Sequence, residues 1–231
     1  MNAKDKLNEL NKRISDFLKL SSENVVVNGV ESLIKLEPHI ELITEAFSVM
    51  VKTVNDCKLF YAWKCISQGL NTERAINEMY NYVDNPGRAY HLSNMMREIV
   101  LSNSVLASSI LGYILGEMIF EKREFTQEDA ILCDALSRMT DFDVKNFAEI
   151  MDSYIGSEFG EEYVDLAKID KEKKNGIIMS LDLFVNTRLF QKVNSVYKDK
   201  TLHMDGIYKK NYIADKMKNY IDKMKQILDY K

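Results

Sequence analysis

Histidine and cysteine side chains are frequent metal ligands and nucleophiles, and this chain contains only three of each. They form no CxxC, CxxH, HExxH or Glu-x-x-His pattern. The six residues are His39, His91, His203, Cys57, Cys65 and Cys133. We therefore expect no bound metal, no cofactor and no redox centre. Free thiols are typical of the reducing cytoplasm, and the segment MNAKDKLNELNKRISDF has no apolar signal-peptide core, so a cytoplasmic protein is predicted.

The carboxylates that come closest to a catalytic pair lie in the segments TQED (126–129) and TDFD (140–143). In each segment an aspartate follows a threonine by three positions, which is the spacing of a capping box at a helix start. The sequence contains neither a glycine-rich phosphate loop nor a G-x-S-x-G nucleophile motif. These observations predict two helix starts and a protein that is not an enzyme.

Charge is distributed unevenly along the chain. Residues 171–231 contain 14 Lys/Arg and 7 Asp/Glu, whereas residues 1–170 contain 17 and 28. A basic end of this kind indicates either an anionic partner such as nucleic acid or a tail that keeps the protein soluble.

The basic end also has a suggestive order of elements. Residues 180–193 have helical apolar spacing with Ser180 as the cap, residues 194–208 are polar and turn-rich, and another helix is expected from Tyr208. A helix, a small β-hairpin and a second helix resemble a winged-helix arrangement, although the same elements could simply close a helical bundle. In the first case the candidate contacts to phosphates are Arg188, Lys192, Lys198, Lys200, Lys209 and Lys210.

The elements that must position these side chains are centred on an apolar segment. Residues 99–120 contain one charged residue, Glu117. A membrane-spanning helix needs about 20 apolar residues, but a helix start at Ser104 leaves about 17, and Glu117 would be costly in hydrocarbon. We therefore predict no membrane span and a buried central helix over about 104–120. Ser108, Gly112 and Gly116 form a row of small residues that would let a neighbouring helix approach closely.

The rest of the chain predicts an all-α fold, an irregular multi-helix bundle of about eight to ten helices. Gly and Pro are scarce, at 9 and 2 residues, and a long helix is expected from Pro38 to Gly69. Segments 156–162 and 171–176 are interpreted as loops. The expected division is an acidic helical domain over 1–160 and a basic C-terminal segment over 161–231 that packs on it. The first and last helices share an apolar spacing that would let them pair with each other or with a second copy, which would give a homodimer. Because the heptad pattern spans few turns, packing of both helices inside the fold is favoured.

Residues 110–150 (ILGYILGEMIFEKREFTQEDAILCDALSRMTDFDVKNFAEI) combine a small-residue apolar helix, a charged link, an FT-x-E-D start and an acidic DFD start. In this order they resemble helical proteins of low-GC Gram-positive bacteria and their phages, some of which are grouped with abortive-infection proteins. The resemblance implies a role in phage–host conflict or mobile-element biology and brings no catalytic residues. The predicted function is a non-enzymatic interaction protein with a protein partner, and the alternative is a DNA-binding regulator that uses residues 171–231.

Overall fold

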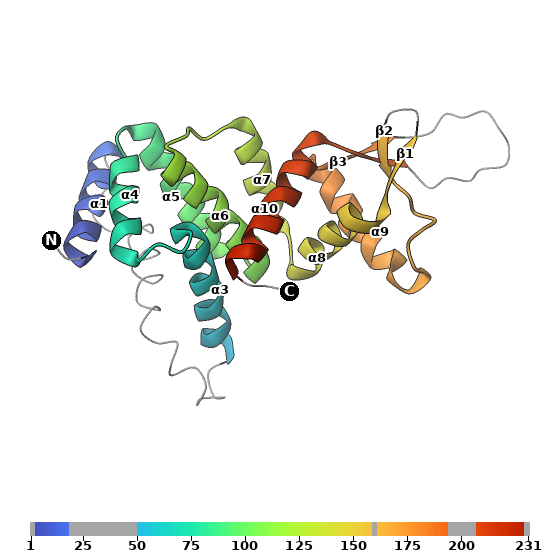
Figure 1. Ribbon diagram of the computed structural model, residues 1–231, viewed down its shortest axis with the longest axis horizontal. Coiled ribbons are helices and arrows are strands. Elements are labelled where there is room, and N and C mark those ends of the chain that lie inside the picture. Colours follow the sequence, from blue (N-terminus) through green and yellow to red (C-terminus); the bar gives the residue numbers. More distant parts are fainter. Residues whose placement is uncertain (1–2, 19–49, 159–160, 194–206, 229–231) are drawn as a thin grey trace.

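The computed structural model describes residues 3–18, 50–158, 161–193 and 207–228 (Figure 1). In this part of the chain the α-helices are α1 (Ala3–Leu18), α3 (Met50–Ser67), α4 (Thr72–Tyr82), α5 (Pro86–Leu101), α6 (Val105–Glu121), α7 (Gln127–Arg138), α8 (Asp141–Glu149), α9 (Lys171–Asn186) and α10 (Tyr212–Leu228). A π turn, η2 (Ile150–Tyr154), follows α8. The strands are β1 (Ile155–Glu158), β2 (Glu161–Val164), β3 (Phe190–Val193) and β4 (Ile207–Lys210). The predicted all-α class with a small β element in the C-terminal part is therefore confirmed.

Both predicted capping boxes are present. The Thr126 hydroxyl accepts a hydrogen bond from the Asp129 amide at the start of α7, and the Asp129 carboxylate accepts one from the Thr126 amide. Thr140 and Asp143 repeat this arrangement at the start of α8. These bonds satisfy amides that a helix start leaves unpaired, so the two acids have structural partners.

Helix α6 is the centre of the bundle, as predicted. Its residues from Ala107 to Gly116 are all buried, and α3, α4, α5, α7, α8 and α10 contact it. Gly112 and Gly116 lie against the α3 backbone: an added Cβ would be 2.5 Å from the Ala62 carbonyl oxygen and 2.6 Å from that of Ile66. The expected close helix approach is thus confirmed, and its partner is α3. In the part of the chain that the structure describes, no helix is long and apolar enough to cross a bilayer.

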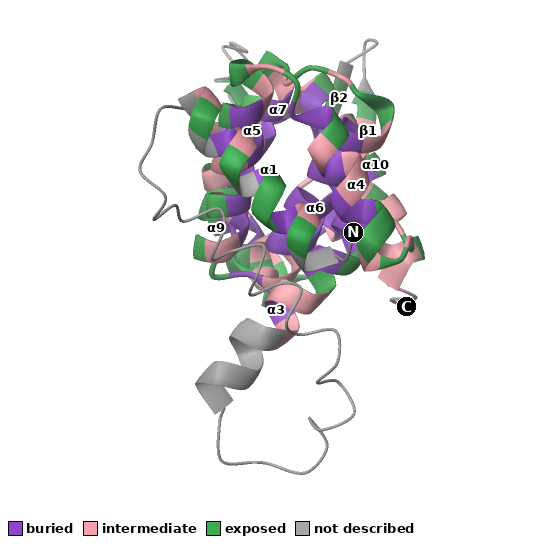
Figure 2. Ribbon diagram, turned by 90° about the vertical axis from the view of Figure 1, so that its left-hand side faces the viewer, coloured by how far each residue is buried: buried purple, intermediate pink, exposed green. Residues whose placement is uncertain are grey.

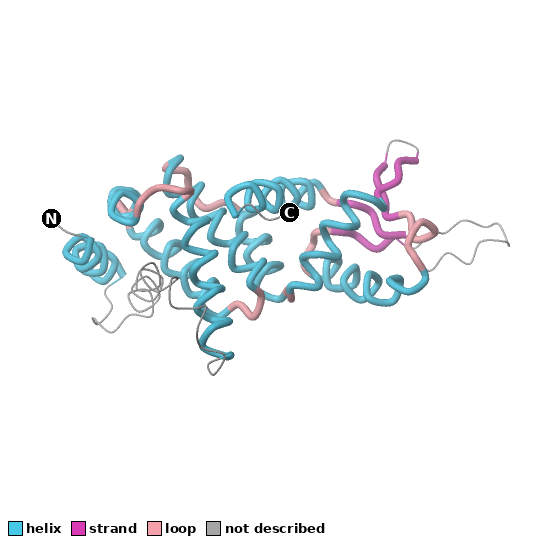
Figure 3. Tube along the Cα trace, turned by 60° about the horizontal axis from the view of Figure 1, so that its bottom comes forward, coloured by secondary structure: helices cyan, strands magenta, loops and turns pink. Residues whose placement is uncertain are grey.

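The molecule is elongated, with α1 and α4 at one end and the sheet at the other (Figures 1 and 3). Figure 2 shows buried residues on the sides of the helices that face one another. Where the chain leaves α3, Gln68 and Gly69 have positive φ angles of 48° and 80°, so the predicted end at Gly69 is correct. The expected start of this helix at Pro38 lies outside the described residues.

The four strands form one antiparallel sheet in the order β1-β2-β4-β3. Three phenylalanines join it to the helices: the Phe147 and Phe184 rings are 5.4 Å apart, and Phe190 of β3 lies 6.0 Å from Phe184. The sheet therefore rests on α8 and α9. Residues 161–231 supply β2, α9, β3, β4 and α10, and α10 packs on α3, α6 and α7.

Several expectations for residues 156–212 are wrong. Residues 171–176 are the first turns of α9, and α9 ends at Asn186. Ser180 does not cap a helix, because its hydroxyl donates to Asp143 Oδ1 at 2.7 Å and accepts from Asn146 Nδ2 at 2.9 Å. Residues 156–158 and 161–162 belong to β1 and β2, and α10 begins at Tyr212 because residues 207–210 form β4.

Candidate functional site

The predicted phosphate contacts that the structure describes lie on the β3–β4 hairpin and the turn before it. Lys192 is on β3, opposite Tyr208, and Lys209 and Lys210 are on β4. Arg188 is exposed in the turn after α9, with a φ angle of 65°. Lys198 and Lys200 lie outside the described residues. The hairpin therefore brings the four described residues into one neighbourhood.

Lys210 is half-buried and is paired with two exposed acids. Its side chain is 10% exposed and pairs with Glu162 and with Asp215 at 2.6 Å. Burial alone would lower the pKa of Lys210, but hydrogen bonds to the two carboxylates outweigh it and raise that pKa. Lys192 Nζ lies 3.6 Å from Asp182 and 5.3 Å from the centre of the Tyr208 ring. These two cations already have intramolecular partners.

The same holds for much of the basic end, whose lysines pair with acids that precede residue 171. The pairs are Lys173 with Glu149, Lys210 with Glu162, Lys216 with Glu128, Lys218 with Asp152 and Lys223 with Glu117. The uneven charge of the sequence is thus largely matched across an internal interface.

A cluster of charges fastens α10 to the end of α6 and the start of α7. Arg123 donates to both oxygens of the fully buried Asp129, at 2.6 and 3.1 Å, and to Glu117 at 3.2 Å. Tyr220 of α10 donates its hydroxyl to Glu117 at 2.9 Å. Burial alone would raise the pKa of Asp129, but the hydrogen bonds from Arg123 and Thr126 lower it.

Lys216, Lys223 and Glu128 complete this cluster, which then contains three cations and three carboxylates. Because its charges balance and its carboxylates already accept hydrogen bonds, we interpret this cluster as a structural ion-pair network that holds α10 against α6 and α7.

One hollow, of about 240 Å³, lies between α5 and α7. Its lining includes His91, which stacks on Phe125 at 4.3 Å, and Cys133. Burial lowers the pKa of His91 and raises that of the Cys133 thiol to about 12. A protonated thiol is a poor nucleophile, so this hollow offers weak catalytic chemistry.

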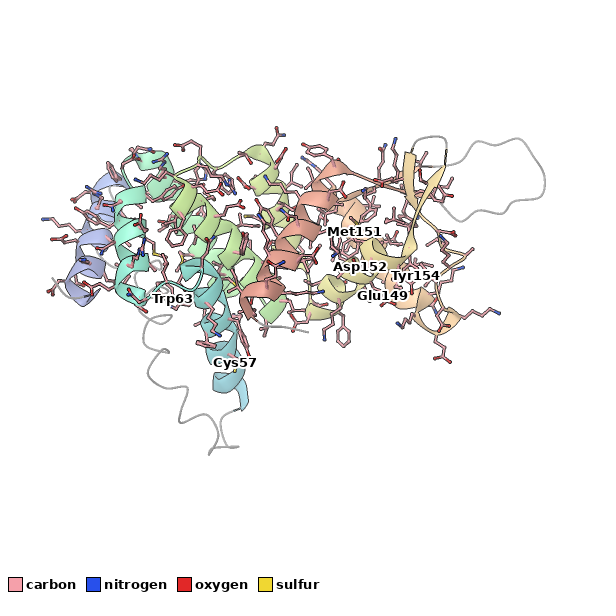
Figure 4. The ribbon with its side chains drawn as sticks, viewed as in Figure 1. Cys57, Trp63, Glu149, Met151, Asp152 and Tyr154 are labelled. Atoms are coloured by element: carbon pink, nitrogen blue, oxygen red, sulfur yellow. The ribbon has the colours of Figure 1, made fainter. Side chains whose placement is uncertain are left out.

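A second hollow, of about 230 Å³, lies between α8 with its π turn and α10. We call it the α8–α10 hollow. Its lining residues are Leu106, Val144, Lys145, Ala148, Glu149, Asp152, Ile221, Met224 and Lys225. Four of the five apolar members are buried and none of the four charged members is, so we call the apolar members the floor and the charged members the rim. In Figure 4 the labelled Glu149 and Asp152 lie at the π turn, beside α10.

The four charges at this rim differ in their contacts. Glu149 accepts hydrogen bonds from Lys173 at 2.8 Å and from Tyr154 at 2.9 Å, and Asp152 pairs with Lys218 at 3.0 Å. Lys145 and Lys225 form no ion pair with any residue that the structure describes. Each rim acid therefore has a cation partner within the chain, with Lys218 shared between Asp152 and Asp222, whereas the two rim lysines have no ion-pair partner among the described residues.

Sequence reasoning missed the α8–α10 hollow. Val144 and Ala148 belong to a short apolar stripe on α8, and Ile221 and Met224 to one on α10, but nothing in the spacing shows that the two stripes meet. The described residues contain no group of three His, Cys, Asp or Glu side chains placed to hold a metal ion. Comparisons with protein-family models, curated proteins and solved structures find no match to this chain.

Proposed function

We propose that this chain is a non-enzymatic protein that acts by binding another protein. The observation that carries this proposal is the α8–α10 hollow, with its apolar floor and its two available lysines. At about 230 Å³ it is smaller than the pockets of roughly 300–1,000 Å³ that take drug-sized ligands and cofactors. It suits one side chain of a macromolecule better, since interface energy concentrates in such anchors.

The remaining basic residues favour a protein partner over nucleic acid. In the described part of 171–231, the cations without an ion pair are Lys171, Lys174, Arg188 and Lys225. Lys171 and Arg188 flank α9, whose 16 residues make it about 24 Å long, and Lys225 is on α10. Scattered cations of this kind are a poor match to the continuous basic surface that neutralises several phosphates.

One observation supports a DNA-binding regulator as the second candidate. The β3–β4 hairpin follows α9 directly, and β4 lies between β2 and β3. A helix followed by an antiparallel hairpin is the order expected of a winged helix. Arg188, in the turn between α9 and β3, would then be the principal phosphate contact. The resemblance of residues 110–150 supports phage–host conflict or mobile-element biology as the setting for either function.

Two measurements on the full-length chain separate these functions. Affinity purification from the source cells, after nuclease treatment and at high salt, is expected to recover one protein in stoichiometric amount. Fluorescence anisotropy with mixed-sequence duplex DNA is expected to show no binding between about 50 and 200 mM salt. A DNA affinity that falls steeply over this range, and that Arg188→Ala weakens, would replace the protein-binding proposal with the regulator.

A further inference from the structure

We propose that the α8–α10 hollow receives one apolar side chain of an acidic partner segment, whose neighbouring Asp or Glu residues contact Lys145 and Lys225. This inference rests on the proposed function and specifies the chemistry of the partner.

The floor of the hollow selects an apolar anchor. Leu106 of α6, Val144 and Ala148 of α8, and Ile221 and Met224 of α10 supply it. A polar side chain placed there would lose its hydrogen bonds to water and gain none from these residues. An aliphatic or aromatic side chain would be removed from water against an apolar surface, and a methionine in the floor can adapt to its shape.

The rim selects negative charge beside that anchor. Asp152 and Glu149 are already paired with Lys218 and Lys173, so neither requires a cation from a partner. Two further acids lie near these lysines on the same helices: Asp141 accepts hydrogen bonds from Ser104 Oγ at 2.5 Å and from the Leu106 amide at 3.0 Å, and Asp222 pairs with Lys218 at 2.6 Å. Lys145 and Lys225 thus have no ion-pair partner among the described residues, and a carboxylate is the complement of their charge.

The walls of the hollow are held in place before any partner arrives. At its start α8 is fixed to α9 by the Asp143–Ser180 hydrogen bond, and at its end by the Lys173–Glu149 pair. The Lys218–Asp152 pair joins the π turn to α10. A site whose walls are fixed loses little conformational entropy on binding, which favours recognition of a short segment.

A peptide-display selection on the full-length chain tests this inference. Random 12-residue peptides are selected on the wild type and on three variants. Lys145→Glu/Lys225→Glu reverses the rim, and Ala148→Leu fills the floor. Lys171→Glu is the matched control, because Lys171 is exposed on α9 and lies outside the hollow. Circular dichroism spectra of all variants should match that of the wild type.

The expected result is enrichment, on the wild type, of peptides that contain an apolar residue flanked by Asp or Glu. A synthetic peptide of this sequence should bind Lys145→Glu/Lys225→Glu about 10- to 30-fold more weakly in anisotropy, since two favourable contacts become repulsive. Ala148→Leu should weaken binding at least about tenfold at all salt concentrations, because the anchor site is filled. Lys171→Glu should bind like the wild type.

Three results would overturn the inference: no enriched peptide, enriched peptides without acidic residues, or equal binding to the rim variant and the wild type. A loss of self-association in the rim variant, seen by light scattering, would also overturn it and assign the hollow to a second copy. If affinity purification recovers the same protein with the rim variant as with the wild type, the proposed function stands and only this use of the hollow fails.

Discussion

Gly112→Ala tests how closely α3 and α6 are packed. The added Cβ would lie 2.5 Å from the Ala62 carbonyl oxygen, and ordinary contact begins at 3.4 Å, so the helices must separate by about 0.9 Å. The obstacle is backbone, which has no rotamer to change, so we take the upper part of the 1–3 kcal/mol range for overpacking, about 3 kcal/mol. The better helix propensity of alanine offsets about 1 kcal/mol of this. The expected net loss is about 2 kcal/mol in the free energy of unfolding, or roughly 4–8 °C in Tm for a chain of this size.

Urea unfolding followed by circular dichroism measures this loss, and Gly176→Ala is the matched control. Gly176 is also helical, in α9, but an added Cβ there meets no atom within 4 Å. The control should be unchanged or up to about 1 kcal/mol more stable. Equal stability of Gly112→Ala and the wild type would refute the reasoning, because it would mean that α3 does not approach α6 as closely as the structure places it.

Substitutions at three further positions test individual contacts. Asp129→Ala should cost about 3 kcal/mol in urea unfolding, because it leaves the Arg123 charge without its buried partner. Since the pKa of Asp129 is lowered from its ordinary value of 3.8, its contribution to the free energy of unfolding is present above pH 3.8 and is lost as the pH falls below it. Asp129→Asn should therefore reduce the fall in the free energy of unfolding at acid pH. An unchanged pH dependence would contradict the assignment. Lys58→Met should lower the free energy of unfolding by about 2 kcal/mol, because the buried ammonium donates to the Val100 and Ser102 carbonyl oxygens, each at 2.8 Å, at the end of α5. Lys64 is exposed, so Lys64→Met is the control and should stay within about 0.5 kcal/mol of the wild type. Thr140→Ala should cost about 1 kcal/mol through the lost cap of α8, and no loss would argue against the capping box.

Local patterns predicted local structure well in this chain. Thr126 and Thr140 cap helices because their spacing to an aspartate is set by the geometry of a single turn. The row of small residues containing Gly112 and Gly116 also predicted a close helix contact, because a surface without side chains lets the backbone of a neighbouring helix approach. The sequence did not say which helix approaches, because Ala62 of α3 and Gly112 of α6 are 50 positions apart along the chain.

The errors arose where tertiary contacts override local preference. The segment KEKKNG (171–176) is polar and contains a glycine, which suggests a loop, but it forms the first turns of α9. The Lys173–Glu149 ion pair and the hydrogen bond from Asn146 to the Gly176 carbonyl hold these turns against α8. Ser180 suggests a cap, but its hydroxyl bonds across to α8. The α8–α10 hollow could not be predicted for the same reason, since Lys145 and Lys225 are 80 positions apart and ordinary surface lysines in isolation.

The position of α10 has a consequence for how the chain is made. This helix covers α6 and supplies the Tyr220 hydroxyl to Glu117, yet it is formed by residues 212–228. During synthesis, the flank of α6 that α10 covers lacks this helix until residues 212–228 leave the ribosome, and the edge of β2 lacks its partner until residues 207–210 of β4 do. Contacts so distant along the chain form late. A nascent chain halted before residue 212 would therefore lack the apolar face of α10 that covers α6, and it is expected to be a better substrate for chaperones and proteases than the full chain.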